Sequence, residues 1–421
     1  MEFDMRKHLP RKVEMLELLL RDGLQSLPNF VPTDTKMWFA DQFIKAGYRK
    51  MEVTNFGNPK ALPQSRDAEE IMKKVWSLEP VKQGNVKLKC YGMNKRAFER
   101  AAQAGQNGYP PHIMAFTISA EDLHGRRNAN KTREEYFREI PELVRIAREN
   151  HFEIDMAIAC TYGSPIAGPV PIKSAVELME RGLDLGIRNF TPCDTTGECN
   201  PLRAYEYMST LVDRFGKYDD EVKFRVAHFH EARGMALANN VAAIQAGARL
   251  VETSLGMGGG QPANMVDGVP GVGTGSIYTN YCETGNSSTE DILVALSEMG
   301  IDVGVDIDKM LQLGRVFEWV LQRSLSPWCT KSGRPIKHPV EWNLTGANLE
   351  YVPPYGPSQT YWADPSRYKP ASNEVIAKEF EGRDLRWDSW GDGKSESEES
   401  PSSKIEMPSL DKTLAAISKG R

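Results

Sequence analysis

The sequence predicts an α/β protein of the (β/α)8 TIM-barrel class with an irregular C-terminal extension. Short β-rich runs alternate with helical patterns eight times between residues 13 and 299, which indicates a parallel sheet covered by helices. Eight such pairs favour a closed barrel over an open doubly wound sheet. The turn after the first run also lacks the G-x-G-x-x-G phosphate loop that the open alternative would favour.

Apolar and β-branched runs predict the strands in chain order. They are Val13–Leu20, Lys50–Thr54, Val86–Tyr91, Ile113–Ile118, Ile154–Cys160, Asn189–Pro192, Lys223–Phe229 and Leu250–Ser254. Apolar stripes with helical spacing predict the helices, for example Met37, Phe39, Ala40, Phe43 and Ile44 within Thr35–Ala46. The remaining helices are expected at Asp67–Trp76, Lys95–Ala104, Arg133–Asn150, Ser174–Leu185, Leu202–Phe215, Gly234–Ala246 and Thr289–Met299.

The domain organisation follows from where this alternation stops. Residues 1–322 are expected to form the barrel domain, and residues 323–390, rich in proline, glycine and aromatics, an irregular extension. Residues 391–421 contain the polar stretch "GDGKSESEESPSSK" and are expected to be disordered, with a short terminal helix at Leu410–Lys419.

Composition excludes several classes of protein. A hydrophobic content of 40% and a charged content of 26% are those of an ordinary soluble protein. The net charge of −5 provides no basic field for nucleic acid. No run of about 18 apolar residues predicts a membrane span, and the N-terminus does not resemble a signal peptide. The six cysteines form no CxxC pair, so we expect a reduced, cytoplasmic compartment.

The stretch "VAHFHEARGMALANN", residues 226–240, carries two histidines one residue apart. In a strand, His228 and His230 would share one face, with Cα atoms about 6.6 Å apart. Both imidazoles could then reach one metal ion. Two satisfied polar residues at a strand end are the alternative interpretation.

Polar residues follow several other predicted strands, at the end where barrel enzymes carry their chemistry. Individually, Asp22 or Asp194 could cap a turn or helix, and Glu52 could pair with Arg21. Together they would surround the histidines at one rim of the barrel. Carboxylate, imidazole and amide ligands suit a divalent ion such as Mg²⁺ or Mn²⁺.

Six motifs then reveal a family resemblance: "RDGLQ", "ACTYGSP", "CDTTG", "HFHEARGMALAN", the loop "GMGGGQP" and "GNSSTEDILVALSEMGI". In this order they resemble the 3-hydroxy-3-methylglutaryl-CoA lyase family and the wider group of metal-dependent barrel lyases and carboxyltransferases. The resemblance covers residues 13–315 and implies reverse Claisen or aldol cleavage of a 3-hydroxy acid or its CoA ester. It also implies a Mg²⁺ or Mn²⁺ cofactor and an acyl-CoA substrate, and we expect a homo-oligomer.

The resemblance assigns roles position by position. The metal ligands are expected to be Asp22, His228, His230 and Asn286, and Arg21 is expected to neutralise the developing enolate. The catalytic set comprises Arg21, Asp22, His228, Glu52, Asp194 and Cys282, with either Asp22 or an imidazole as general base. Substrate or supporting roles are expected for Glu17, Gln25, Asn55, Thr195, Gly258, Gly259, Gln261 and Glu290.

Three departures from the family pattern leave the substrate open. Gln261–Pro262 stands where the lyase loop carries a cysteine before a proline, and Cys282 could replace that thiol or simply be buried. The loop after the eighth strand is longer than in the lyase, and "SLPNF" follows "RDGLQ" in place of an acidic and basic pair. A condensing enzyme or aldolase acting on 2-oxo acids therefore stays an alternative, as does a catalytically retired binding barrel.

Overall fold

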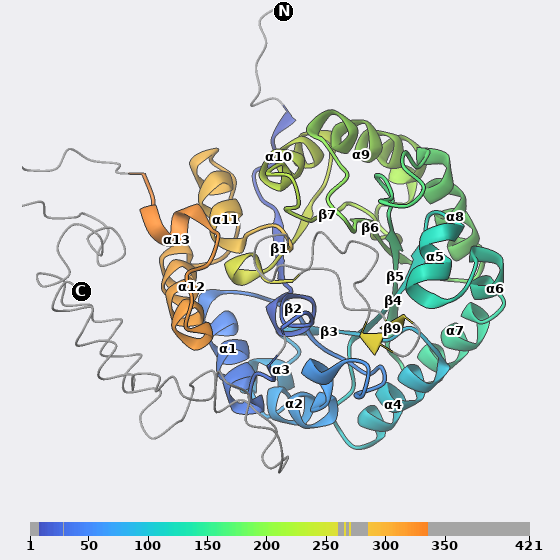
Figure 1. The fold of residues 1–421 in the computed structure, drawn as a ribbon, viewed down its shortest axis with the longest axis horizontal. Helices are drawn as coiled ribbons and strands as arrows, with labels where there is room; N and C mark the ends of the chain where they lie inside the picture. The colour runs from blue at the N-terminus through green and yellow to red at the C-terminus, as the bar shows by residue number, and fades with distance from the viewer. Residues whose placement is uncertain (1–7, 28, 260–264, 267–268, 271–284, 336–421) are drawn as a thin grey trace, which may run out of the picture.

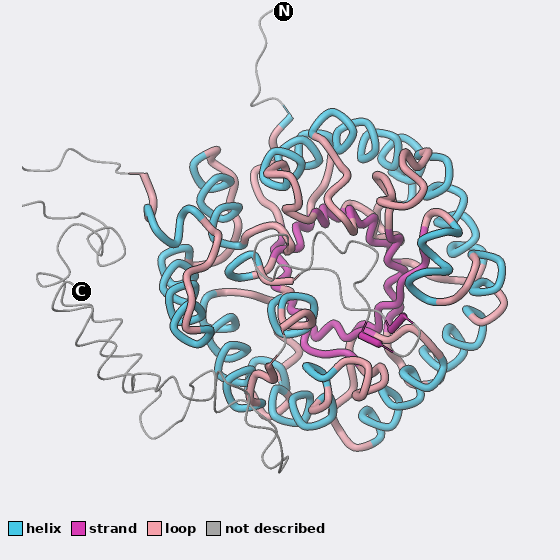
Figure 2. The backbone as a smooth tube through the Cα atoms, viewed as in Figure 1, coloured by secondary structure: helices cyan, strands magenta, loops and turns pink. Residues whose placement is uncertain are grey.

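The computed structural model describes residues 8–27, 29–259, 265–266, 269–270 and 285–335. Eight parallel strands close into a barrel in chain order, with helices forming the outer ring (Figures 1 and 2). The strands are β1 (Glu14–Glu17), β2 (Lys50–Asn55), β3 (Lys87–Tyr91), β4 (Ile113–Ser119), β5 (Glu153–Ala159), β6 (Asn189–Asp194), β7 (Val226–Phe229) and β8 (Leu250–Thr253). The predicted fold class is confirmed, and the open-sheet alternative is excluded.

Closure depends on the pairing of the first and last strands. β1 lies parallel to β8 over four residue pairs, from Glu14–Leu250 to Glu17–Thr253. The outer helices are α1 (Thr33–Ala46), α2 (Ala68–Val75), α3 (Glu79–Lys82), α4 (Lys95–Gln106), α5 (Asp122–Ala129), α6 (Arg133–Phe137), α7 (Ile140–Glu149), α8 (Ile172–Asp184), α9 (Pro201–Phe215), α10 (Ala236–Ala246), α11 (Thr289–Glu298), α12 (Ile307–Leu321) and α13 (Trp328–Ser332). Their apolar faces form one continuous core against the outward-facing strand residues.

The first strand is shorter than predicted. β1 ends at Glu17, and Leu19–Gly23 form a π-helix in place of the expected continuation to Leu20. The Glu17 carboxylate accepts hydrogen bonds from the backbone N–H groups of Leu19 and Leu255, at 3.0 and 2.8 Å. Within this π-helix, Arg21 and Asp22 line the central cavity.

Two helical regions also differ from the prediction. The single helix expected over Arg133–Asn150 is interrupted between α6 and α7, because Pro141 would leave the Phe137 carbonyl without its N–H donor and clash with it. The extension predicted to be irregular from residue 323 contains the short helix α13. The rest of the extension and the predicted tail lie outside the described residues.

No helix in the described part of the chain is long and apolar enough to span a membrane. Within that part, Cys90, Cys160, Cys193, Cys199 and Cys329 are all free thiols.

Candidate active site

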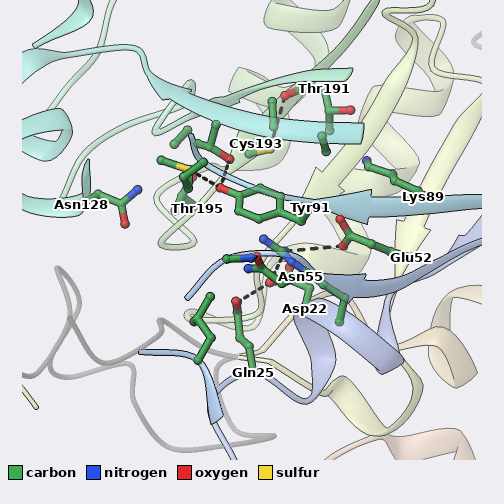
Figure 3. A pocket seen from close by; sticks show the side chains of 18 of the residues that line it. Asp22, Gln25, Glu52, Asn55, Lys89, Tyr91, Asn128, Thr191, Cys193 and Thr195 are labelled. Atoms are coloured by element: carbon green, nitrogen blue, oxygen red, sulfur yellow. Dashed lines mark hydrogen bonds and ion pairs between the residues drawn. The ribbon is translucent and has the colours of Figure 1, made fainter. Parts of the chain in front are cut away.

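A cavity of about 310 Å³ lies inside the barrel, and residues from the carboxyl ends of the strands line it. Figure 3 shows side chains from strands and from the segments that follow them around this cavity, among them Asp22, Glu52, Tyr91 and Thr195. Of the predicted site residues, Arg21, Asp22, Gln25, Glu52, Asn55, Thr195, His228 and His230 line this cavity. These residues therefore meet at one rim, as the sequence predicted.

Asp22, His228 and His230 form a cluster that could hold a metal ion. One potential ligand atom from each residue lies within 4.8 Å of the other two. The two imidazole rings have centroids 5.4 Å apart, and all three residues are buried. Strand alternation explains the arrangement, because His228 ends the inward-facing row of β7 and His230 follows two positions later.

Asn286 lies beside this cluster, although 264 residues separate it from Asp22. Its backbone forms a β-bridge with His230, and its Nδ2 donates to Asp22 Oδ2 at 3.0 Å. The amide oxygen of Asn286 is buried and has no hydrogen-bond partner among the described residues. A buried oxygen without a donor is what an oxygen-seeking divalent ion would satisfy, so the donor set fits the implied metal.

Glycines allow the loop after β8 to pack against this cluster. A Cβ atom added at Gly258 would lie 3.1 Å from the backbone of Gly23, and one at Gly259 would lie 2.7 Å from Asn286 Nδ2. Gly259 also has a φ of +116°, which side-chain-bearing residues rarely adopt. Both glycines therefore pack closely enough to position Asn286, and their substrate role stays a prediction.

Arg21 is a buried cation at the edge of the metal cluster. Its Nη1 lies 2.9 Å from Asp22 Oδ1 and 3.5 Å from Glu52 Oε2, and its guanidinium stacks 3.8 Å above the Tyr91 ring. Although burial opposes the charged form, Glu52 and Asp22 raise the pKa of Arg21. A permanently protonated, oriented cation therefore faces the cavity.

The two carboxylates beside Arg21 have different proton affinities. Burial raises the pKa of Glu52 to about 7. Burial has the same tendency at Asp22, but Arg21 and the two histidines outweigh it and lower the pKa of this carboxyl. Asp22 is thus suited to remain ionised as a ligand, whereas Glu52 can exchange a proton near neutral pH.

Three other predicted residues at the rim form hydrogen bonds with neighbouring side-chain or backbone groups. Gln25 donates to Asp22 Oδ1 from its amide nitrogen. Asn55 Oδ1 accepts from the Gly57 N–H at 2.7 Å, and Thr195 Oγ1 accepts from the Cys160 N–H at 2.9 Å. All three also line the cavity, which is compatible with their predicted substrate contacts.

The structure places Glu17, Asp194 and Glu290 next to the residues that line the cavity, where they bind loop groups around the site. Glu17 faces the outer layer, where Thr289 Oγ1 also donates to it at 2.7 Å. Asp194 accepts from the Cys199 N–H at 3.0 Å, and Glu290 accepts from the Gly256 N–H at 3.0 Å. They stabilise the loops around the site, and the catalytic role of Asp194 stays a prediction.

Alternation along β6 explains the position of Asp194. Its strand neighbour Cys193 pairs with His228 and faces the cavity, whereas Asp194 pairs with Phe229 and binds the loop backbone at Cys199. Burial raises the pKa of Asp194 and Glu17 to about 7 and that of Glu290 to about 8. The predicted residues Gln261 and Cys282 lie outside the described part of the chain.

Sequence reasoning missed two cavity-lining charges, Lys89 and Glu252. Glu252 accepts a hydrogen bond from His228 Nδ1 over 2.8 Å, and Lys89 lies 2.8 Å from the other carboxylate oxygen. Burial raises the free energy of the ionised Glu252, but Lys89 and His228 outweigh it and lower its pKa to about 2. The available signal was a charged residue within each short strand, Lys89 in "KLKCY" and Glu252 in "LVET".

Comparison with known proteins agrees with this geometry. Residues 12–317 match the model of the HMGL-like family. The hydroxymethylglutaryl-CoA lyase YngG of Bacillus subtilis is 29% identical over 318 residues, which cover 76% of this chain and 95% of that protein. The human mitochondrial hydroxymethylglutaryl-CoA lyase is 27% identical over 76% of this chain and 88% of its own length.

A solved structure shows the same relationship in three dimensions. The HMG-CoA lyase from Acinetobacter baumannii, in complex with coenzyme A and 3-methylmalate, superposes with a TM-score of 0.66 at 27% identity. The match covers 81% of this chain and all of that one, 100%. The resemblance predicted from the sequence is confirmed: the chain belongs to the HMGL-like family, as a carbon–carbon lyase of the HMGL-like type.

Proposed function

We propose that this protein cleaves a carbon–carbon bond of a 3-hydroxyacyl-CoA, 3-hydroxy-3-methylglutaryl-CoA or a close analogue, with Mg²⁺ or Mn²⁺ as cofactor. The observation that carries the proposal is the buried cluster of Asp22, His228 and His230 beside the Asn286 amide oxygen, for which residues 8–27, 29–259 and 285–335 offer no hydrogen-bond partner. Arg21 faces the same cavity, so a metal site and an enolate-stabilising cation lie side by side. The coenzyme A in the related A. baumannii structure supports a CoA ester as substrate.

Asp22, His228, His230 and Asn286 would hold the divalent ion. When bound, such an ion lowers the pKa of a substrate hydroxyl and orients the substrate by chelation. Asp22 and Asn286 also hold each other through their hydrogen bond, which fixes the oxygen ligands before metal binds. Oxygen ligands together with imidazole suit both ions, so metal availability would decide between Mg²⁺ and Mn²⁺.

Glu52 and Arg21 would supply proton abstraction and charge stabilisation, respectively. Glu52 takes the proton from the 3-hydroxyl, because burial places its pKa near neutral pH. The electron pair of that O–H bond forms the carbonyl of one product, while the pair of the breaking C–C bond moves into the enolate of the CoA ester. Arg21 stabilises the enolate charge until a proton donor, Cys282 in this proposal, converts it to the acyl-CoA product.

The test is direct: purified protein with Mg²⁺ or Mn²⁺ and 3-hydroxy-3-methylglutaryl-CoA is assayed for acetyl-CoA and acetoacetate. A panel of other 3-hydroxyacyl-CoA esters follows in the same assay. Failure of every ester, with metal bound, would overturn the proposed substrate class.

The condensing or aldolase alternative uses the same enolate chemistry. Release of free thiol from acetyl-CoA in the presence of 2-oxo acids would favour the condensing enzyme. A retired barrel would neither bind the metal tightly nor turn over any substrate in these assays. The cytoplasmic location of this protein and its assembly into homo-oligomers stay predictions.

A further inference from the structure

Below the metal cluster, a chain of charged side chains crosses the interior of the barrel. Lys89 Nζ on β3 lies 2.8 Å from Glu252 Oε1 on β8 and 2.7 Å from Asp155 Oδ2 on β5. Glu252 Oε2 accepts from His228 Nδ1 at 2.8 Å, and the Thr191 hydroxyl donates to Asp155 at 2.9 Å. An unbroken series of contacts thus connects Thr191 to a predicted metal ligand.

The contacts of Lys89 span strands that are not neighbours. β3 is paired with β2 and β4, whereas Glu252 belongs to β8 on another side of the barrel. The lysine therefore reaches across the barrel interior, and its side chain is only 6% exposed. The side chains of Asp155 and Glu252 are 7% and 2% exposed, so water screens little of this interaction.

Stability alone does not explain these charges. Barrel interiors are usually filled by branched apolar residues, and a buried ion pair generally stabilises a fold no better than such residues would. The series also contains two carboxylates for one lysine. Lys89 contacts one oxygen of Glu252, and the second oxygen faces the imidazole of His228.

We propose that Glu252, held in place by Lys89 and Asp155, is a positioning residue that fixes His228 so that Nε2 is presented to the metal ion. With Nδ1 committed to Glu252, only Nε2 is free to act as a ligand. Outer hydrogen bonds of this kind orient metal-bound histidines and raise their basicity, and their loss weakens metal affinity by about 10- to 100-fold. The proposal rests on the metal site of the proposed function but assigns new roles to Lys89, Asp155 and Glu252.

The test measures Mn²⁺ affinity by electron paramagnetic resonance titration of the full-length protein, without reference to activity. Glu252→Gln is expected to weaken Mn²⁺ binding about 10- to 100-fold and to change the nitrogen hyperfine coupling of the bound ion. Because Lys89→Met alone would leave two buried carboxylates without a cation, the double variant Lys89→Met/Asp155→Leu removes that pair of charges together. It is expected to weaken Mn²⁺ binding several-fold, whereas Lys89→Arg retains most of the affinity.

Lys87→Met is the matched control. Lys87 lies two residues earlier on β3 and pairs with Glu153 at 2.9 Å, but both side chains are 48% exposed. The Lys87→Met protein should bind Mn²⁺ with the same affinity as the wild type. If the folded Glu252→Gln and double variants bind Mn²⁺ within twofold of the wild type, the positioning role is overturned while the proposed function stands. If the wild type itself binds no Mn²⁺, both proposals fail.

Discussion

Asn286 donates a hydrogen bond to Asp22 over 3.0 Å, and the oxygen of the same amide is buried with no partner in the part of the chain that the structure describes. This relationship joins the π-helix after β1 to the segment before α11. The amide nitrogen of Asn286 thus holds the predicted ligand Asp22, and the amide oxygen can itself be a ligand. Asn286→Ala should therefore remove both a ligand and the support of Asp22.

For Asn286→Ala we expect Mn²⁺ affinity to fall by at least about tenfold, with the circular dichroism spectrum unchanged. Calorimetric titration measures this directly. Asn239→Ala, another buried asparagine, on α10, is the control and should bind Mn²⁺ normally. Equal affinity of the Asn286→Ala protein and the wild type would remove Asn286 from the ligand set.

Arg21→Met tests the cation beside the cavity. Loss of a fixed charge that acts on the enolate should lower kcat about 10²- to 10³-fold. Mn²⁺ affinity should change far less, because Arg21 contacts the ligand Asp22 but is not itself a ligand. A variant that loses metal binding in proportion to its rate would show that Arg21 supports the metal site instead.

Glu52 gives the reaction a predicted pH dependence. Its pKa is raised from 4.5 to about 7 by burial, so the fraction able to accept a proton falls as the pH decreases through 7. At saturating Mn²⁺, kcat should decline over this range in the wild type. Glu52→Gln should lower kcat about 10²- to 10⁴-fold and abolish this inflection; an unchanged inflection would assign the titration to another group.

The raised pKa of Glu290 predicts how the stability of the fold depends on pH. Burial raises its pKa to about 8 in the folded protein, against an ordinary value of 4.5. Between these values the folded state binds more protons than the unfolded state, so the free energy of unfolding should decrease as the pH rises from 5 to 8.

Chemical denaturation at several pH values measures this effect. Glu290→Gln should flatten the decrease, whereas Glu177→Gln, at an exposed position on α8, should leave it unchanged. A pH dependence of equal slope in Glu290→Gln and the wild type would show that other groups determine it.

The proton donor can be identified by comparing two thiols. Cys193 lines the cavity, and burial raises its pKa well above the ordinary value, so its thiol stays protonated. Cys282→Ser should lower kcat by about 10²-fold or more if it supplies the proton, and Cys193→Ser should not. The opposite result would transfer the role to Cys193, and two normal variants would exclude both thiols.

The sequence predicted the barrel well because alternation of strand and helix patterns is a local signal repeated eight times. It failed where a single contact overrides the local pattern, as at Glu17, whose hydrogen bonds end β1 early. The break at Pro141 could have been predicted from proline chemistry alone.

The site was predictable where a motif already contained the geometry, as in the alternation of His228 and His230. For Asp194 the sequence could not tell which of two adjacent residues faces the cavity, since this depends on the register between β6 and β7. Lys89 and Glu252 were missed for a related reason, because the two strands that bring them together are far apart in the sequence.

The most direct test of the central claim is the stoichiometry of Mn²⁺ binding to the wild type and to His228→Ala. One tightly bound Mn²⁺ per chain is predicted for the wild type, with nitrogen hyperfine coupling, and a loss of that binding for the folded variant. A wild-type protein that binds no Mn²⁺, or a His228→Ala protein that binds it equally well, would contradict the account.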